Sequence, residues 1–165
     1  SVLSVQSIEH VPDPERAVAE AARVLERGGV AVFVTPNRLT FGRPDEIIDP
    51  YHYVEFDPGE LRELLAASFG RVELRGIFGS PIYMEHYEAE RRTLDRLLAR
   101  DPLRLRRLLP RRLRQRLYDW RLGRERRGGA ELSAITPADF SLGETDLEQA
   151  LDLVGIASRP RRAGI

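Results

Sequence analysis

The first 35 residues constrain the fold of this chain more than any other stretch. Two short apolar segments, residues 2–5 and 30–35, flank a segment with the pattern of a helix. Asp13 is a suitable N-cap, Pro14 fits the first helical position, and the glycines at 28–29 can end the helix. Two apolar strands joined by a helix are typical of a parallel pair that is covered on both faces. Such crossovers are almost always right-handed, so we predict an open α/β sheet.

The position of a functional site follows from this sheet. Ligands of open α/β sheets bind outside the carboxyl ends of the strands. Polar residues 6–11 follow the first strand, and the turn formed by residues 35–37 follows the second. We therefore expect the site at these two segments.

Composition excludes several kinds of chemistry. The chain has 165 residues, 26 basic and 26 acidic side chains, and no Cys, and every basic residue is Arg. The length favours one domain, and the zero net charge gives no general attraction to an acidic partner. Without Cys there is no disulfide, thiolate nucleophile or cysteine zinc site. Without Lys there is no Schiff base, no phosphate-loop lysine and no Tyr-x-x-x-Lys dehydrogenase pair.

The start of the chain suggests a fragment. It begins at Ser1, inside what reads as a strand, so we expect that its beginning is missing. It lacks the basic segment and the apolar segment of a signal peptide, and no apolar run is long enough to cross a membrane. We therefore expect a cytoplasmic protein without a membrane span.

Local signals predict the remaining elements. Asp57 and Glu60 have the spacing of a capping box, which predicts a helix over 58–68. We expect strands at 72–78 and at 151–157, and a short extended segment at 140–142. Residues 36–53 read as a long loop, and 159–165 as a frayed tail.

Residues 84–127 are rich in arginine, with 15 Arg against seven acids. Their pattern predicts helices over about 85–100 and from 101 and 110 onward. We rank three interpretations: a solvated face, then a lid over an anionic or polar acceptor. A nucleic-acid or membrane surface around Arg112, Arg116 and Trp120 comes last.

Three stretches together resemble a known enzyme family. They are Ser-Val-Gln-Ser-Ile-Glu-His-Val-Pro-Asp-Pro at 4–14, Arg-Val-Leu-Glu-Arg-Gly-Gly-Val at 23–30 and Thr-Pro-Asn at 35–37. The combination resembles the second half of class I S-adenosylmethionine-dependent methyltransferases, in the subgroup that includes the ubiquinone-pathway O-methyltransferases. The likeness continues through residues 51–56 and the helix that follows, which is about the first eighty residues.

The resemblance implies a fold and a division of the chain. The family's sheet has seven strands, and the last is antiparallel and inserted beside the sixth. Strands four to seven would be residues 2–5, 30–35, 72–78 and 151–157. The fold would be a Rossmann-like α/β sheet that lacks its first three strands. The expected parts are half of the core at 1–83, an Arg-rich helical insertion at 84–130, the final strand region at 131–158 and a tail at 159–165.

The sequence departs from the family where the cofactor is mainly bound. The acidic-x-Gly-x-Gly loop after strand one and the acidic residue ending strand two have no counterpart here. The resemblance therefore implies a parent protein that transfers a methyl group from S-adenosylmethionine to a small-molecule acceptor. We expect this piece to need the missing N-terminal half of its own domain, and to be inactive and marginally stable without it.

By the same resemblance, Val5, Gln6 and Ser7 would contact the methionine end of the cofactor. The alternative is a polar strand exit without such a role. Glu9 and His10 stand just beyond the strand and are candidate base and orienting group, and His52 in the long loop can approach them. Alternatively, Glu9 is a carboxylate favoured by the dipole of the next helix, and His10 only packs at the turn.

Three further residues are candidates for substrate binding. Asn37 can hydrogen-bond a substrate, or it can cap the loop as ordinary turn chemistry. Tyr83 and Tyr87 can line an acceptor pocket, although apolar residues at helical spacing more often form core.

A metal site is the last alternative. A subset of small-RNA 2′-O-methyltransferases carries Glu-x-x-Glu-His and a later His as magnesium ligands. This chain is similar at Glu9, His10 and His52, but Gln6 replaces the first Glu, which weakens a site for a hard cation. We therefore predict no metal. The other functions considered are a non-enzymatic binding module built on the Arg-rich helices and, less favoured, a dehydrogenase.

Overall fold

The computed structural model describes residues 1–41, 47–98, 109–110, 112–116 and 135–161. The chain forms two compact units. The first contains Ser1–Phe78 and Leu142–Ile165, and the second contains Gly79–Ser141. The expected site residues fall in both units, so each unit is described separately.

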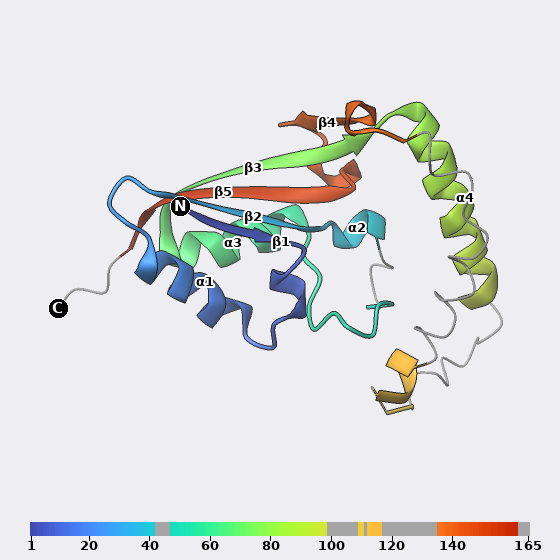
Figure 1. Ribbon diagram of the computed structural model, residues 1–165, viewed down its shortest axis with the longest axis horizontal. Helices are drawn as coiled ribbons and strands as arrows, with labels where there is room; N and C mark the ends of the chain where they lie inside the picture. The colour runs from blue at the N-terminus through green and yellow to red at the C-terminus, as the bar shows by residue number, and fades with distance from the viewer. Residues whose placement is uncertain (42–46, 99–108, 111, 117–134, 162–165) are drawn as a thin grey trace. The chain divides into compact units, whose positions relative to one another are not determined.

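A five-stranded mixed sheet forms the framework, in the order β1-β2-β5-β3-β4 (Figure 1). Its strands are β1 (Val2–Val5), β2 (Val30–Pro36), β3 (Phe69–Gly79), β4 (Phe140–Gly143) and β5 (Asp152–Pro160). The strands β1 and β2 are parallel, with Val5 opposite Val34. The strand β5 is antiparallel to both β2 and β3 and lies between them. The predicted α/β class is confirmed, and the last strand is inserted antiparallel as the resemblance implied.

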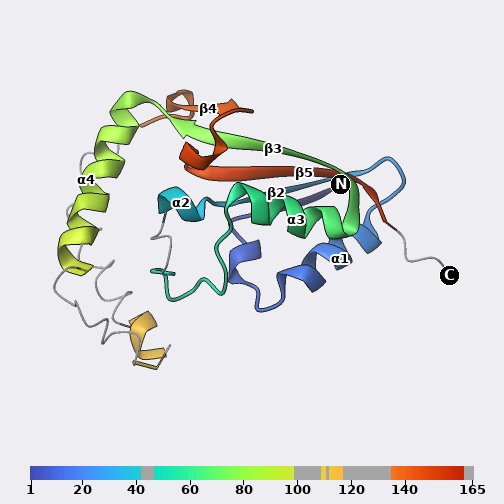
Figure 2. The same ribbon diagram turned by 180° about the vertical axis from the view of Figure 1, so that it is seen from behind.

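Two helices cover the same face of this sheet, α1 (Pro14–Val24) and α3 (Pro58–Ser68) (Figures 1 and 2). Asp13 caps α1 by accepting a 2.9 Å hydrogen bond from the backbone of Arg16. Asp57 and Glu60 form the predicted capping box of α3. The apolar side chains on one side of these helices, and of the residues that follow them, are buried: Val18, Ala21, Ala22, Leu25, Leu61, Leu64, Leu65 and Phe69. Burial of these side chains supplies most of the drive for the unit to fold.

Element boundaries differ from the sequence predictions where tertiary contacts decide them. The helix α1 ends at Val24, because Leu25 is already extended, and Gly28 takes its left-handed φ of 78° in the turn that follows. The strand β3 begins at Phe69 rather than 72 because β5 pairs with it as far as Pro160. Strand pairing therefore continues into the stretch that was expected to begin a frayed tail.

The first strand is less buried than its apolar sequence predicted. Leu3 is 71% exposed and Val5 is 50% exposed. The strand β1 lies at one end of the sheet order. Among the described strands, it pairs with β2 along one edge. The expectation of burial on both faces is therefore wrong for the chain as it stands.

Short elements lie around the ends of β1, β2 and β5. These are the 3-10 turns η1 (Ile8–His10) and η5 (Leu147–Gln149) and the helix α2 (Arg38–Phe41). The helix α2 breaks the long loop that was predicted over 36–53. The elements η1 and α2 start within three residues of the ends of β1 and β2, so they extend the two strand ends that the sequence marked as functional.

The second unit begins with the helix α4 (Pro81–Leu98), which starts four residues earlier than the predicted start at about 85. The turn η4 (Pro137–Asp139) contacts its start, because the hydroxyl of Ser80 donates to a carboxylate oxygen of Asp139 at 2.9 Å. The helices predicted from 101 and 110 lie largely outside the described residues. Among the described helices, none combines the length and the apolar character that a membrane span needs.

Candidate functional site

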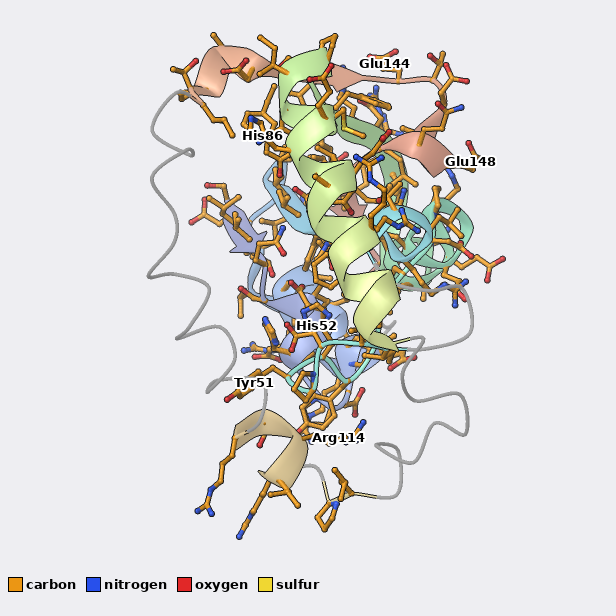
Figure 3. All side chains as sticks on the ribbon, turned by 90° about the vertical axis from the view of Figure 1, so that its right-hand side faces the viewer. Tyr51, His52, His86, Arg114, Glu144 and Glu148 are labelled. Atoms are coloured by element: carbon orange, nitrogen blue, oxygen red, sulfur yellow. The ribbon has the colours of Figure 1, made fainter. Side chains whose placement is uncertain are left out.

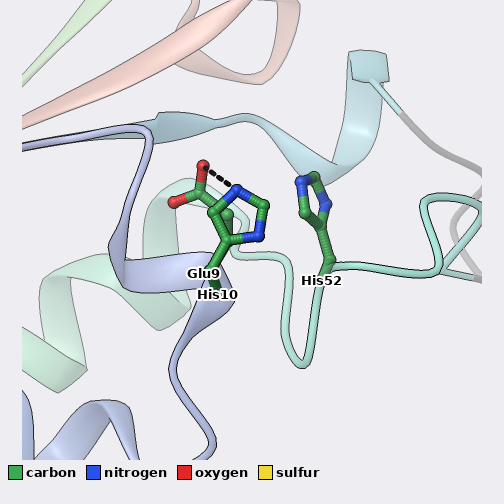
Figure 4. Close-up of side chains that lie close together, drawn as sticks. All are labelled: Glu9, His10 and His52. Carbon is green, nitrogen blue, oxygen red and sulfur yellow. Dashed lines mark ion pairs between the residues drawn. The ribbon is translucent and has the colours of Figure 1, made fainter. Parts of the chain in front are cut away.

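Three of the predicted site residues meet at the carboxyl end of β1. Glu9 and His10 lie on η1, and His52 comes from the loop before α3 (Figure 4). The loop is held by the backbone of Tyr53, which donates a 2.8 Å hydrogen bond to the carbonyl of Glu9. The rings of His10 and His52 meet edge to face, with centroids 4.9 Å apart. The approach of His52 to His10 that the sequence suggested is present.

Glu9 is the buried acid of this cluster. Its side chain is 0% exposed, and its Oε2 accepts a 3.1 Å hydrogen bond from the hydroxyl of Thr35 at the end of β2. Its Oε1 has no hydrogen-bond partner among the described residues, and Nε2 of His10 lies 4.0 Å away from it. A buried carboxylate is costly unless it is paired, so this oxygen is available to a cation or proton donor.

His10 presents a reactive nitrogen to this cluster. Its side chain is 42% exposed, and its Nδ1 lies 3.3 Å from the carbonyl oxygen of Tyr51. A carbonyl only accepts, so Nδ1 carries the hydrogen and Nε2 of the neutral ring has the lone pair. This assignment follows from the hydrogen-bond partner. The lone pair of Nε2 can therefore take a proton or bind a metal ion.

His52 is held from its other side. Its Nδ1 lies 2.8 Å from Oε1 of the buried Glu55, and Oδ2 of Asp49 lies 4.0 Å from its Nε2. The ring of Phe41 packs against the ring of His52, with the two centroids 5.3 Å apart. Burial lowers the pKa of His52, but the hydrogen bond to Glu55 and the charges of Asp49, Glu55 and Glu9 outweigh it, so the pKa is raised. Figure 3 shows His52 next to Tyr51 on this loop.

The expected cofactor residues form an exposed turn next to the cluster. Val5, Gln6 and Ser7 are all exposed. Gln6 has a φ of 46°, a conformation that is uncommon for a residue other than Gly. Its Nε2 donates to Oδ1 of Asp152 at 3.0 Å, and its backbone N–H donates to the carbonyl of Val34 at 2.8 Å. The turn is thus tied to both β2 and β5.

Asp152 at the start of β5 completes this end of the sheet. Burial raises the pKa of its carboxyl, the hydrogen bond from Gln6 lowers it, and the charge of Glu9 raises it, with a net rise. The negative charge of Glu9 therefore disfavours the ionised form of Asp152. This is a second sign that the end of the sheet has an excess of carboxylates.

Asn37 is buried and its amide is fully engaged. Its Nδ2 lies 2.8 Å from the carbonyl of Ala150 and 3.0 Å from that of Leu147, and donates to both. Its Oδ1 accepts from the backbone of Leu39 at 3.1 Å. These contacts connect α2 to η5. They favour loop capping, the alternative to the predicted role in substrate binding.

Tyr83 and Tyr87 belong to the second unit. Their rings stack at 6.2 Å, and Phe140 meets Tyr83 edge to face at 4.7 Å. All three side chains are partly exposed. Their predicted role in lining an acceptor pocket stays a prediction.

Comparison with known proteins finds similarity to methyltransferases. A family model described as "Methyltransferase domain" matches residues 1–33. Two Mycobacterium tuberculosis proteins, from strains CDC 1551 and H37Rv, are each named "Probable S-adenosylmethionine-dependent methyltransferase". Each is 34% identical over 96% of this chain and 54% of its own length. A protein of Mycolicibacterium smegmatis with a similar name is 34% identical and is covered over 58% of its length.

The chain is a homologue of these probable S-adenosylmethionine-dependent methyltransferases. It spans about half the length of the curated relatives that it matches. No solved structure gave a significant match. The comparisons bear out the methyltransferase resemblance and leave its finer subgroup open.

Three side chains that shape the site of this methyltransferase homologue were not given a role from the sequence, although Thr35 lies in the turn that was expected at the site. They are Thr35 and Glu55, which hold Glu9 and His52, and Asp152, which holds Gln6. The spacing of His52 and Glu55 by three residues is a signal for their contact. The contacts of Thr35 with Glu9 and of Asp152 with Gln6 join segments far apart in sequence, so no local pattern reveals them.

Proposed function

We propose that this chain is part of an S-adenosylmethionine-dependent methyltransferase that acts on a small-molecule acceptor. The single observation that carries the proposal is the cluster of Glu9, His10 and His52 beside the exposed turn at the carboxyl end of β1. This is where an open α/β sheet binds its ligands. Homology to proteins named as such methyltransferases gives independent support.

The sheet supports a specific assignment of strands. We assign β1, β2, β3 and β5 to strands four, five, six and seven of the methyltransferase sheet. The antiparallel β5 between β2 and β3 supports it, since the resemblance implied an antiparallel last strand inserted beside the sixth. Remaining cofactor contacts would come from the part of the relatives that this chain does not match.

The turn after β1 fits one side of the cofactor site. Val5, Gln6 and Ser7 are exposed, and Gln6 adopts a left-handed conformation where the chain leaves β1. Rare backbone conformations of this kind are concentrated at functional sites. The cofactor supplies a methyl group already activated on a sulfonium, so the protein mainly aligns acceptor and donor.

The cluster supplies the remaining chemistry, which is removal of a proton from the acceptor. The lone pair of His10 Nε2 accepts a proton from an acceptor hydroxyl. The N–H at Nδ1 continues to donate its hydrogen bond to the carbonyl of Tyr51. The charge that forms on His10 is stabilised by the Glu9 carboxylate 4.0 Å away. His52 packs against His10 and limits the orientations of its ring.

The test is methyl transfer by the natural protein that contains this chain. It is incubated with S-adenosylmethionine labelled with tritium in the methyl group and a panel of phenols, hydroxy acids and sugars. Wild type should label an acceptor, and His10→Ala should lower the rate by about 10²–10⁴-fold, as expected for loss of a general base. The control His86→Ala removes an exposed histidine of α4 and should keep the wild-type rate (Figure 3). Equal rates for wild type and His10→Ala would refute the base.

A further inference from the structure

We propose that Glu9, His10 and His52 bind a divalent transition-metal ion, in contrast to the absence of metal that the sequence predicted. Each side chain offers one ligand atom, and the three atoms lie within 4.8 Å of one another. Two of the ligands are adjacent on η1, and the third comes from a loop that is hydrogen-bonded to the same turn. The group is therefore assembled by the fold and is not a chance surface cluster.

The atoms of each side chain that do not face the cluster are already bound. Nδ1 of His10 donates to the Tyr51 carbonyl, Nδ1 of His52 donates to Glu55, and Oε2 of Glu9 accepts from Thr35. These bonds leave Nε2 of both rings and Oε1 of Glu9 as ligand atoms. Metal-binding histidines are usually oriented in this way, with the second ring nitrogen bonded to a carboxylate or a carbonyl.

The charge around the cluster also favours a cation. Glu9 and Glu55 are buried, and each has one oxygen, Oε1 and Oε2 respectively, without a hydrogen-bond partner among the described residues. Asp49 brings a third carboxylate to 4.0 Å from Nε2 of His52. Buried carboxylates without a compensating charge are strongly unfavourable, and a divalent ion at Oε1 of Glu9 would supply it.

The ligand types indicate which ion fits. Two imidazole nitrogens and one carboxylate suit zinc and similar divalent transition metals, whereas magnesium prefers oxygen ligands. Gln6 adds no oxygen, because its side chain is turned to Asp152. Ligand atoms around tetrahedral zinc are about 3.4 Å apart, so the pair at 4.0 Å must close slightly on binding. His10 is exposed enough to make this movement.

A bound ion would change how the site removes a proton. It would occupy Nε2 of His10, and an acceptor hydroxyl at an open coordination position would lose its proton more readily. This consequence rests on the proposed function, whereas metal binding itself does not.

The experiment measures binding of zinc and of cobalt to the metal-free protein at about pH 8, where free imidazole is neutral. Neither S-adenosylmethionine nor an acceptor is present, so its outcome is independent of methyl transfer. We expect one ion per chain by calorimetry, and visible cobalt absorption bands of a site with nitrogen ligands. Glu55→Gln should weaken binding by about 10–100-fold, because it loosens the orientation of His52. His10→Ala should weaken it further.

Two controls keep the result interpretable. His86→Ala removes an exposed histidine outside the cluster and should bind as wild type does. His10 is itself exposed, so circular dichroism should show that His10→Ala keeps the fold. Binding that is unchanged in His10→Ala, or that falls equally in His86→Ala, would overturn the proposal, as would the absence of binding to folded wild type.

Discussion

The hydroxyl of Thr35 donates a 3.1 Å hydrogen bond to Oε2 of Glu9, and both side chains are fully buried. This bond connects the end of β2 to η1, the turn that follows β1. The two strand ends that the sequence marked separately are thus joined through one carboxylate. The position of Glu9 depends on this bond, and the cluster depends on the position of Glu9.

Replacing Thr35 by Val should destabilise the protein. The change keeps the shape of the side chain and removes the donor, which leaves a buried carboxylate oxygen without its partner. We expect the free energy of unfolding to fall by about 1–3 kcal/mol, measured by urea denaturation. Thr35→Ser keeps the hydroxyl and should lose less. A Val variant as stable as wild type would mean that Glu9 does not rely on Thr35.

Replacing Asn37 by Asp should also destabilise the protein. The amide donor would become a carboxylate that faces the carbonyls of Ala150 and Leu147 at 2.8 and 3.0 Å. We expect a loss of about 2 kcal/mol or more in the free energy of unfolding. Asn37→Ala should lose less, because it removes the donor without placing a negative charge against the carbonyls. If Asn37 instead binds substrate, its variants should keep wild-type stability and show only a raised KM.

Gly155 on β5 should not tolerate Ala. A Cβ at this position would overlap Cδ1 of Leu65, which α3 packs against the strand. Overpacking of this kind typically costs about 1–3 kcal/mol in thermal or urea unfolding. The double variant Gly155→Ala with Leu65→Ala should lose less free energy of unfolding than the sum of the two single variants. The shorter side chain at 65 makes room for the Cβ at 155, and that Cβ fills part of the cavity left by Leu65. Strict additivity would show that the two sites do not contact.

The Asp152 carboxyl should give stability a defined pH dependence in the metal-free protein. Its pKa is raised in the folded state, chiefly by burial, above the unfolded value of about 3.9. The stability that it contributes is therefore fully present below about pH 3.9 and is lost as pH rises through the folded-state pKa. Asp152→Asn keeps an oxygen for Gln6 and does not titrate. Urea unfolding should show wild type losing stability relative to Asp152→Asn as the pH rises above the unfolded-state pKa of about 3.9. A relative gain would contradict the raised pKa.

The sequence predicted those features that local signals encode. The starts of α1 and α3 were placed correctly because Asp13 and Asp57 cap them with their own side chains. The extent of β3 and β5 was underestimated, because pairing between Phe69 and Pro160 extends both strands beyond their apolar centres. Gly155 lies inside β5, where Leu65 of α3 packs so closely that a Cβ would overlap it.

The site was predicted in part for the same reason. Glu9 and His10 follow a strand directly, so the general geometry of α/β sheets indicated their place. The approach of His52 to His10 was expected if the long loop folds over the strand ends, and the two ring centroids are 4.9 Å apart. The orienting partners Thr35 and Glu55, and the engagement of Gln6 by Asp152, depend on how distant segments pack.

The most direct test of the account is photolabelling of the natural protein with S-adenosylmethionine that carries tritium in its methyl group. The labelled protein is digested, and the labelled peptides are identified by mass spectrometry. Within this chain, we predict label in the peptide that contains residues 5–10. We also expect S-adenosylhomocysteine to compete with the labelling. Label confined to peptides from α4, or an absence of label in this chain when the protein is active, would contradict the placement of the site at the carboxyl end of β1.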